Sequence, residues 1–268
     1  MINKILSPNN KFIKEVLSLQ LKSKERKKTG KFPIEGIKEI SFAIKFNVIV
    51  EKILFCPEII SLKSVKELIG TEYDSAVKYE LSREAFSKIS YRESTGGVVV
   101  IAKAVYNSLE DIKVKDKSLF IILESVEKPG NLGSIVRIAD AAKIDAVIIC
   151  DQLTDIYNPN VIRASLGCVF SVKIVNSDTE NVLKWIKENN IVSYAAELNS
   201  SEFYHSCNFS NPSAIAFGTE AFGLSQKWID SADKRIKIPM LGNIDSLNVA
   251  NSVAIIVYEA RRQLNFLV

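Results

Sequence analysis

The residues best suited to chemistry gather in three short segments of the C-terminal half. In the first, Asn131 precedes an apolar stretch that contains Arg137. A cation among apolar helical residues needs either a partner or a function. Gly130 lets the backbone approach a ligand closely, and free amides at a helix N-terminus favour an anion. Asn131 and Arg137 are therefore candidate ligand-binding residues, with a structural salt bridge of Arg137 as the alternative.

The second and third segments add a carboxylate and further polar side chains. Glu220 lies between Gly218 and Gly223, in a turn that follows a predicted strand. Ser246 is a natural N-cap for the last predicted helix, whereas Asn248 is a poor helix former that usually has a partner. The alternatives are a solvent-exposed Glu220 and plain capping roles for Ser246 and Asn248.

All three segments follow or adjoin predicted strands. Apolar, β-branched runs predict buried strands, and periodic stretches between them predict helices. The predicted strands are 119–124, 146–150, 170–175, 191–196, 214–218 and 235–239, and the predicted helices are 131–142, 158–166, 178–189, 225–231 and 246–264. This alternation is typical of an α/β fold with a mostly parallel sheet covered on both faces. Ligands bind at the C-terminal edge of such sheets, where the three segments are expected.

The N-terminal half predicts a small α/β domain over residues 1–105, joined by a polar linker at 106–117 to a second domain at 118–268. Its first helix is expected over 9–28. The ten-residue stretch at and just beyond the end of that helix is basic, with Lys22, Lys24, Arg26, Lys27, Lys28 and Lys31 offset only by Glu25. Such a cluster can neutralise phosphates, and a solvated helix end is the alternative.

Composition narrows the chemistry further. Of the 268 residues, 47% are hydrophobic and 25% charged, as in ordinary soluble proteins. The one histidine, His205, has no partner motif, so we expect an enzyme that works without imidazole. Four widely spaced cysteines form no C-x-x-C pair, which predicts free buried thiols and no metal site. No apolar run could span a bilayer and the first residues do not resemble a signal peptide, so we expect a cytoplasmic protein without a membrane partner.

Taken together, the three segments resemble the motifs of the SpoU/TrmH family of RNA 2′-O-ribose methyltransferases, in the SPOUT superfamily. The matches, in the family's order, are N-x-G-x-x-x-R-x-A at 131–139, G-x-E-x-x-G-L-S at 218–225, and I-P-M followed by S-L-N-V within 238–249. The resemblance covers 118–268 well. Residues 1–105 are similar, more loosely, to the family's accessory domain, which has a small ribosomal-protein-like RNA-binding fold. Thr219 departs from the asparagine or serine that is common in the second motif.

The resemblance implies an S-adenosylmethionine-dependent methyltransferase that is a homodimer. It also implies a SPOUT-type trefoil knot in the C-terminal domain, an exception to the rule that chains do not thread loops. The cofactor would bind against the backbone around Gly218, Ile238 and Leu247. The side chains implied around the reacting ribose are Asn131, Arg137, Glu220, Ser246 and Asn248.

The resemblance also implies an RNA partner, and ribosomal RNA is favoured over transfer RNA because an accessory domain is present. The RNA-binding candidates are Lys24, Arg26, Lys27, Lys28 and Arg163, the last in a segment at 160–167 that looks like a part of the family sequence between the first two motifs. A guanidinium stays protonated at ordinary pH. We therefore expect Arg137 to orient the ribose or a phosphate and to stabilise the developing alkoxide.

Two other functions stay open on the residues alone. The strand, loop and helix over 119–142, followed by Asp151, imitate the opening of a Rossmann dinucleotide-binding unit, although the glycines form G-x-x-G at 130–133 instead of G-x-G-x-x-G. The other is a non-catalytic RNA-binding protein, which the N-terminal domain and its basic cluster would support. The intact Arg137, Glu220 and Asn248 argue against it.

Overall fold

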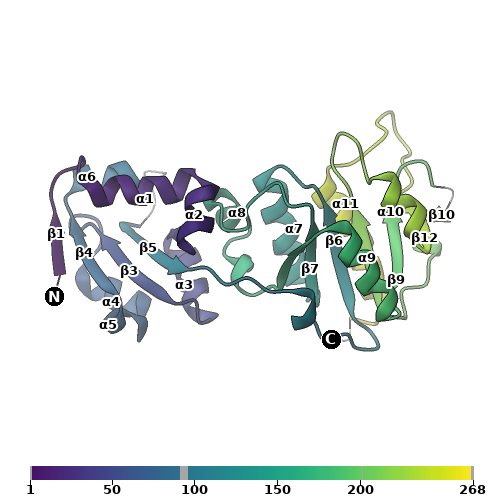
Figure 1. Ribbon diagram of the computed structural model, residues 1–268, viewed down its shortest axis with the longest axis horizontal. Coiled ribbons are helices and arrows are strands. Elements are labelled where there is room, and N and C mark those ends of the chain that lie inside the picture. The colour runs from purple at the N-terminus through teal and green to yellow at the C-terminus, as the bar shows by residue number, and fades with distance from the viewer. Residues whose placement is uncertain (1, 91–95, 201, 267–268) are drawn as a thin grey trace. The chain divides into compact units, whose positions relative to one another are not determined.

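The computed structural model describes residues 2–90, 96–200 and 202–266 and contains two compact units. Unit 1 consists of Met1–Val105 and Asp155–Ser171, and unit 2 consists of Tyr106–Thr154 and Val172–Val268. Each unit combines one sheet with helices, so the predicted α/β class is confirmed (Figure 1). No helix among the described residues is long and apolar enough to cross a membrane.

Unit 1 is built on a five-stranded mixed sheet in the order β1-β4-β3-β5-β2. β1, β4 and β3 are parallel, whereas β5 pairs antiparallel with both β3 and β2. The strands are β1 Ile2–Ile5, β2 Lys31–Glu35, β3 Val50–Phe55, β4 Val77–Leu81 and β5 Val98–Lys103. β5 is buried along nearly its whole length, as its run of β-branched residues predicts.

Helices flank this sheet (Figure 1). They are α1 Lys11–Leu21, α2 Ser23–Thr29, α3 Ile37–Lys45, α4 Leu62–Ile69, α5 Glu72–Ser75, α6 Arg83–Ile89 and α8 Pro159–Ala164. α1 and α6 share one core cluster with the sheet, in which Val16 and Phe86 pack with Leu54. The helix expected over 9–28 is two helices, because Lys22 adopts an extended backbone (φ −119°, ψ 111°) that ends α1 and precedes α2.

The basic cluster divides into exposed and buried members in α2. Lys24, Lys27 and Lys28 are exposed, but Arg26 is only 2% exposed. Its Nε lies 2.6 Å from Asp155 Oδ2, and its Nη1 donates to main-chain oxygens at the end of α1 at 2.7 and 3.1 Å. The prediction that Arg26 binds RNA phosphates is therefore wrong, because the residue is buried, with its Nε in an ion pair and its Nη1 bound to main-chain oxygens inside unit 1.

Asp155 begins a segment that the sequence division placed in the C-terminal domain. Asp155–Ser171 belongs to unit 1 and contains α8 and a 3₁₀ turn at Cys168–Phe170. Tyr157 stacks on Phe32 of β2, with ring centroids 4.0 Å apart. The chain therefore passes between the units three times, at 105–106, 154–155 and 171–172.

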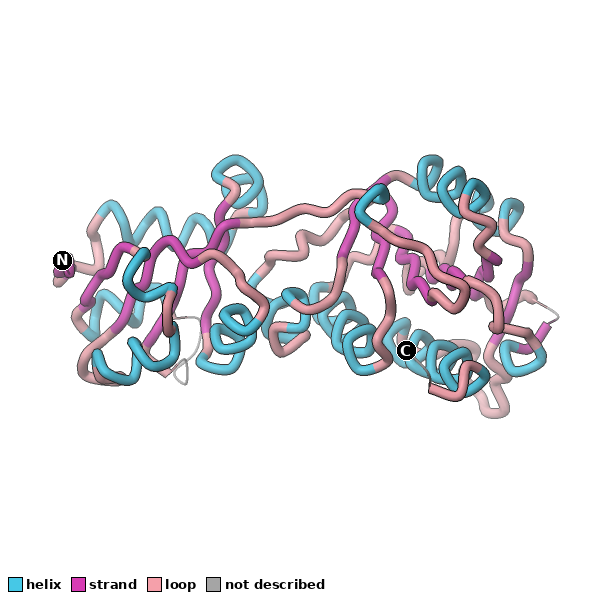
Figure 2. The backbone as a smooth tube through the Cα atoms, turned by 90° about the horizontal axis from the view of Figure 1, so that it is seen from below, coloured by secondary structure: helices cyan, strands magenta, loops and turns pink. Residues whose placement is uncertain are grey.

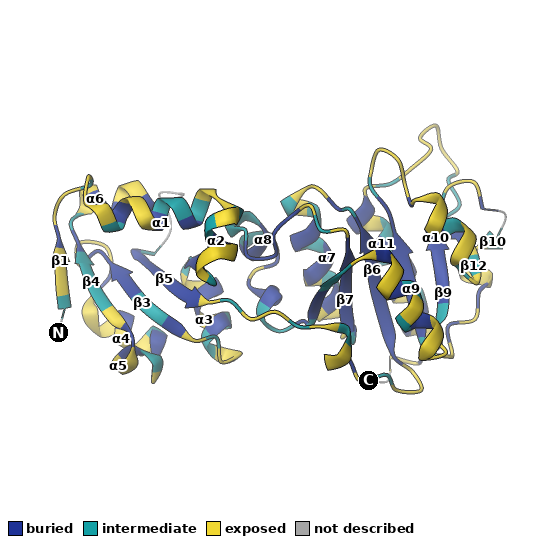
Figure 3. Cartoon of the chain, in the orientation of Figure 1, coloured by how far each residue is buried: buried dark blue, intermediate teal, exposed yellow. Residues whose placement is uncertain are grey.

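Unit 2 contains a seven-stranded sheet in the order β10-β12-β9-β11-β6-β7-β8, and every pairing in it is parallel. The strands are β6 Leu119–Glu124, β7 Ala146–Cys150, β8 Ile174–Ser177, β9 Val192–Ala196, β10 Glu202–Phe203, β11 Ser213–Phe217 and β12 Lys234–Lys237. The central strands β6, β7 and β11 are buried throughout, as their unbroken apolar runs predict (Figure 3). The C-terminal ends of all these strands point to one edge.

Helices cover both faces of this sheet (Figure 2). They are α7 Pro129–Ala141, α9 Thr179–Glu188, α10 Gln226–Ser231 and α11 Val249–Gln263. α9 and α10 pack on one face, where Val182 and Trp228 share a cluster with Phe120. α7 and α11 pack against each other on the opposite face (Figure 1). Residues 106–117, the expected linker, lie in unit 2 and contain a 3₁₀ turn at Leu109–Asp111.

Candidate active site

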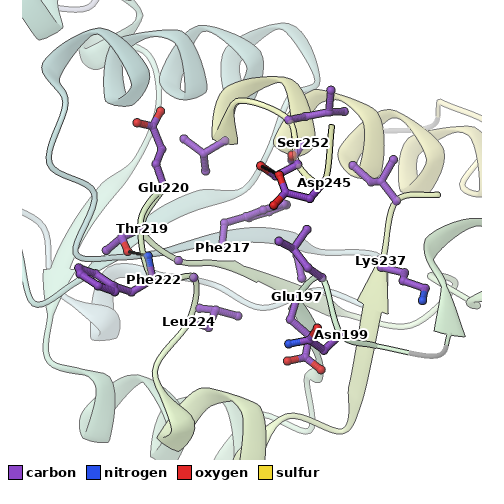
Figure 4. Close-up of a pocket in the computed structure, with 18 of the residues that line it drawn as sticks. Glu197, Asn199, Phe217, Thr219, Glu220, Phe222, Leu224, Lys237, Asp245 and Ser252 are labelled. Carbon is purple, nitrogen blue, oxygen red and sulfur yellow. Dashed lines mark hydrogen bonds between the residues drawn. The ribbon is translucent and has the colours of Figure 1, made fainter. Parts of the chain in front are cut away.

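A cavity of about 390 Å³, which we call pocket A, lies at the C-terminal edge of the unit 2 sheet. Its walls are the segments that follow β9, β11 and β12, the loop before α11 and the first turns of that helix (Figure 4). Gly218, Ile238 and Leu247, which the sequence predicts as cofactor-binding residues, all line pocket A, as do Glu220 and Ser246. Its volume lies within the about 300–1,000 Å³ typical of small-molecule sites.

A second cavity of about 340 Å³, pocket B, adjoins pocket A. It is lined by residues 126–128 and by Asn131 of α7. Both cavities are lined by residues 218–221 and by Val249. The loop that carries Glu220 is therefore common to the two cavities.

This loop has a closely defined backbone. Thr219 and Gly223 exchange two main-chain hydrogen bonds of 3.0 Å, which close a tight turn around Glu220. Gly223 has φ +68°, a left-handed conformation that glycine adopts without strain. Gly218 must also be glycine, because a Cβ there would lie 2.0 Å from the main chain of Gly223. The two glycines fix the point from which the Glu220 side chain projects.

A buried carboxylate fastens the end of the same loop to the sheet. Glu124, the last residue of β6, accepts hydrogen bonds from both the main-chain nitrogen and the Oγ of Ser225, each at 2.7 Å. Glu124 was not among the residues predicted from the sequence. Nothing in the sequence around Glu124 indicates that it binds Ser225. The available indication was the serine of the G-L-S motif, whose hydroxyl requires a hydrogen-bond acceptor.

Glu220 is the centre of a hydrogen-bond network between the three sequence segments. Its Oε1 accepts hydrogen bonds from the side-chain amides of Asn131 and Asn248, the latter at 3.1 Å. Its Oε2 accepts one from the ammonium group of Lys128. The Asn248 amide also lies 3.1 Å from Asn131 Oδ1. Three of the five predicted catalytic side chains thus meet at one carboxylate.

These neighbours stabilise the ionised form of Glu220. The hydrogen bond from Lys128 lowers the pKa of the Glu220 carboxyl, and the hydrogen bond from Asn131 acts in the same direction, whereas desolvation opposes both. Glu220 therefore serves here as an acceptor that holds amides in place. Lys128 was missed in the sequence, where its position just before the predicted helix gave no indication of its partner.

Asn248 also caps α11, a role that the sequence favours for Ser246 and offers for Asn248 only as the alternative to chemistry. Asn248 is the N-cap of α11, and its Oδ1 accepts a hydrogen bond of 3.0 Å from the Ala250 nitrogen. The prediction that Ser246 caps this helix is wrong, because α11 begins at Val249. Ser246 is exposed and donates to Asp245 Oδ1 at 3.1 Å, where both residues line pocket A.

Arg137 stands apart from this network. It lies on the exposed side of α7, about 9 Å along the helix axis from Asn131. No acceptor for its guanidinium is found among the described residues, so the structural salt bridge proposed as an alternative is not observed there. Gly130 has open space where a Cβ would project, so no described residue requires glycine there, and its close approach to a ligand stays a prediction.

The remaining RNA-binding candidates lie in unit 1. Lys24, Lys27 and Lys28 project from α2. Arg163, in α8, is half-buried and donates to Asn160 Oδ1 at 3.1 Å. None of these residues lines pocket A or pocket B.

Comparison with known proteins explains why these motifs converge. A family model described as the SpoU rRNA Methylase family matches residues 118–258, more than half of the chain. The chain belongs to the SpoU rRNA methylase family. A second model, described as the MRM3-like substrate binding domain, matches residues 10–100.

Relatives of this SpoU chain match nearly its whole length. It is 28% identical over 261 residues to the 23S rRNA (guanosine(2553)-2'-O)-methyltransferase RlmP of Bacillus subtilis, with 97% of this chain and 100% of that protein covered. It is 29% identical to the 23S rRNA (uridine(2479)-2'-O)-methyltransferase of Streptomyces viridochromogenes, with 89% and 85% covered. The crystal structure of an AdoMet-bound rRNA methyltransferase from Sinorhizobium meliloti superposes with a TM-score of 0.90 at 28% identity, covering 98% of both chains.

The SpoU assignment displaces the dinucleotide-binding alternative. Asp151, the acid that a Rossmann site would need, lines neither pocket A nor pocket B. Its Oδ2 instead accepts a hydrogen bond of 2.8 Å from Thr179 Oγ1. The trefoil knot expected of a SpoU protein stays a prediction.

Proposed function

We propose that this chain transfers a methyl group from S-adenosylmethionine to the 2′-oxygen of a ribose in ribosomal RNA. The observation that carries the proposal is the Glu220 network at the wall common to pockets A and B. Such a wall allows a cofactor on one side and a nucleotide on the other to meet at fixed side chains.

Pocket A fits the cofactor in composition and position. Leu247, Ile238 and Phe217 give it apolar walls, and the glycine turn at 218–223 brings main-chain groups to its surface. S-adenosylmethionine, when bound, supplies a methyl group on a sulfonium centre. The protein's task is to hold an acceptor hydroxyl in line with that group, and fixed positioning can contribute about 7–11 kcal/mol in ideal cases.

The network residues would position the ribose. Asn131 and Asn248 keep amide groups directed at Glu220, so a hydroxyl entering pocket B meets preorganised donors and acceptors. Arg137 would add a second cation to that of Lys128, which is already paired with Glu220. Its exposed guanidinium would bind the ribose or its phosphate in a bidentate manner and stabilise the developing alkoxide.

The substrate would be ribosomal RNA, which both named relatives modify. Unit 1 would contribute phosphate contacts through Lys24, Lys27 and Lys28. This protein would act in the cytoplasm. The protein would act as a homodimer, a proposal supported by large exposed apolar side chains near its C-terminus, among them Leu241 (96% exposed) and Ile244 (61%). Light scattering coupled to size exclusion would measure the assembly.

The decisive experiment is to map ribose methylation in total RNA from cells with and without the gene. We expect one or a few 2′-O-methyl positions in ribosomal RNA to disappear. Purified protein should restore them with S-adenosylmethionine, whereas Arg137→Ala and Arg137→Lys should not, since lysine lacks the planar fork of donors. Unchanged methylation in cells lacking the gene, or full activity of Arg137→Lys, would contradict these roles.

A further inference from the structure

Pocket A contains a carboxylate that the Glu220 network does not use. Glu197 follows the C-terminal end of β9 and lines the pocket. Its side chain is only 13% exposed. Within the described part of the chain, the cationic group that comes within 4.0 Å of it is the Arg235 guanidinium, with Nη1 at that distance from Glu197 Oε1. Among the described residues, no donor lies within hydrogen-bond distance of this carboxylate.

The Glu197 carboxylate lacks the hydrogen bonds that a largely buried charged group normally has. Withdrawing a charged group from water is unfavourable unless hydrogen bonds replace the water. The Glu197 main-chain nitrogen donates to the Ile236 oxygen at 3.0 Å, whereas neither side-chain oxygen accepts a hydrogen bond from a described residue. Glu197 and Glu220 lie well apart in the view of the pocket, so the two acids serve different parts of a bound molecule (Figure 4).

A nucleoside cofactor offers two kinds of strong hydrogen-bond donor to Glu197, the ribose hydroxyls and an ammonium group. Two carboxylate oxygens match the vicinal hydroxyls of a ribose, and acids that follow parallel strands bind ribose hydroxyls in other α/β proteins. An ammonium group is the other strong donor. Arg235 disfavours it, because a second cation beside Glu197 would be repelled by the guanidinium. Neutral hydroxyls incur no such repulsion.

We propose that Glu197 accepts hydrogen bonds from the 2′- and 3′-hydroxyls of the S-adenosylmethionine ribose. This assignment rests on the proposed function, since it takes pocket A as the cofactor site. It makes Glu197 a residue that selects a ribonucleoside cofactor, separate from the side chains that position the RNA.

The test measures binding without turnover. Calorimetry with S-adenosylhomocysteine, which has the same ribose, would be compared with an analogue that lacks both ribose hydroxyls. We expect Glu197→Ala to weaken binding of S-adenosylhomocysteine roughly 10- to 100-fold, since hydrogen bonds to a charged group are removed. Removing the hydroxyls should weaken binding to the wild-type protein by a similar factor and should have little further effect in the variant.

Three comparisons make the result specific. Glu197→Gln keeps the side-chain shape and one acceptor oxygen, so an intermediate affinity is expected with unchanged thermal unfolding. Glu188→Gln, on the exposed surface of α9, is the matched control and should bind as the wild type does. Asp245→Asn tests another carboxylate that lines the pocket and lies outside the Glu220 network, and loss of the hydroxyl effect in that variant alone would overturn the assignment.

Failure of this inference is distinguishable from failure of the proposed function. Wild-type binding of S-adenosylhomocysteine with no loss in Glu197→Ala would overturn the role of Glu197 and leave the cofactor assignment standing. A wild-type protein that binds neither S-adenosylhomocysteine nor S-adenosylmethionine would overturn both.

Discussion

The Asn248 side-chain amide lies 3.1 Å from Glu220 Oε1, while the oxygen of the same amide caps α11. A single side chain thus sets the start of a helix and holds the carboxylate of a separate loop. The two roles use opposite ends of the amide, so they can be separated by mutation.

Asn248→Asp should keep the helix cap and remove the hydrogen bond to Glu220. Aspartate is as good an N-cap as asparagine, but it has no amide donor and repels a neighbouring carboxylate. We expect methylation to fall roughly 10- to 100-fold with a free energy of unfolding near that of the wild type. Asn248→Ala should lose both roles and be about 1 kcal/mol less stable. Methyl incorporation and urea denaturation measure the two effects, and a fully active Asn248→Asp would refute the division.

The ion pair between Lys128 and Glu220 should be visible in the pH dependence of activity. Lys128 lowers the pKa of Glu220, so the carboxylate stays ionised to lower pH than it would alone. In Lys128→Ala that pKa rises, and activity should be lost at a higher pH as the solution is acidified. The profile of kcat/KM against pH measures this shift of the acidic limb.

The same pair has a consequence for folding, with the same sign. A carboxyl whose pKa is lowered by folding stabilises the protein above its unfolded-state pKa, and this contribution disappears as pH falls through the folded-state value.

The control for the activity profile is Lys184→Ala, which removes an exposed lysine of α9 and should leave the acidic limb of kcat/KM in place. An identical limb in Lys128→Ala would show that the ion pair has no influence on the reaction.

Removing either partner of the buried pair between Arg26 and Asp155 should destabilise the protein strongly. Both side chains are nearly inaccessible, at 3% and 5% exposure. Arg26→Met leaves Asp155 as an uncompensated buried charge, which costs about 3–5 kcal/mol. The double variant Arg26→Met with Asp155→Leu should recover part of that loss. Chemical denaturation measures each, with exposed Lys27→Ala as the control, and a loss below about 0.5 kcal/mol in Arg26→Met would contradict a buried pair.

The exposed lysines of α2 should contribute to RNA binding through phosphates. Replacing Lys24, Lys27 and Lys28 together by glutamine should weaken binding of ribosomal RNA and reduce the log–log salt slope by up to about 0.7–0.9 for each phosphate that is no longer neutralised. Cofactor affinity should not change, because pocket A lies in unit 2. The matched control replaces the exposed Lys113, Lys115 and Lys117 of unit 2. Equal losses in both triple variants would indicate a general charge effect.

Periodic apolar patterns predicted most of the fold because they report burial directly. The strands at 119–124 and 146–150 have the predicted bounds, and the other strands predicted in unit 2 shift by a few residues. Very short elements were missed, among them β1 Ile2–Ile5 and β10 Glu202–Phe203, because so few residues show no period. The break at Lys22 was also missed, since its residue type does not oppose a helix.

The site was predicted less evenly. Glycines and polar residues at strand ends indicated Asn131, Glu220 and Asn248, which the structure brings into one network. Sequence charge alone cannot show whether a cation is exposed, so Arg26 was grouped with its lysine neighbours although its partner lies 129 positions away. Lys128 and Glu197 were missed for a related reason, because the groups around each side chain come from segments that are distant in the sequence.

The assignment of Asp155–Ser171 to unit 1 affects how the protein can be made and divided. A nascent chain leaves the ribosome with its N-terminus first, so residues 1–105 emerge well before the segment that completes unit 1. Until then Arg26 has no counterion and Phe32 lacks the ring of Tyr157. A fragment that ends at residue 105 would therefore lack part of unit 1, so residues 1–105 should not be expressed alone or fused to another protein as a complete domain.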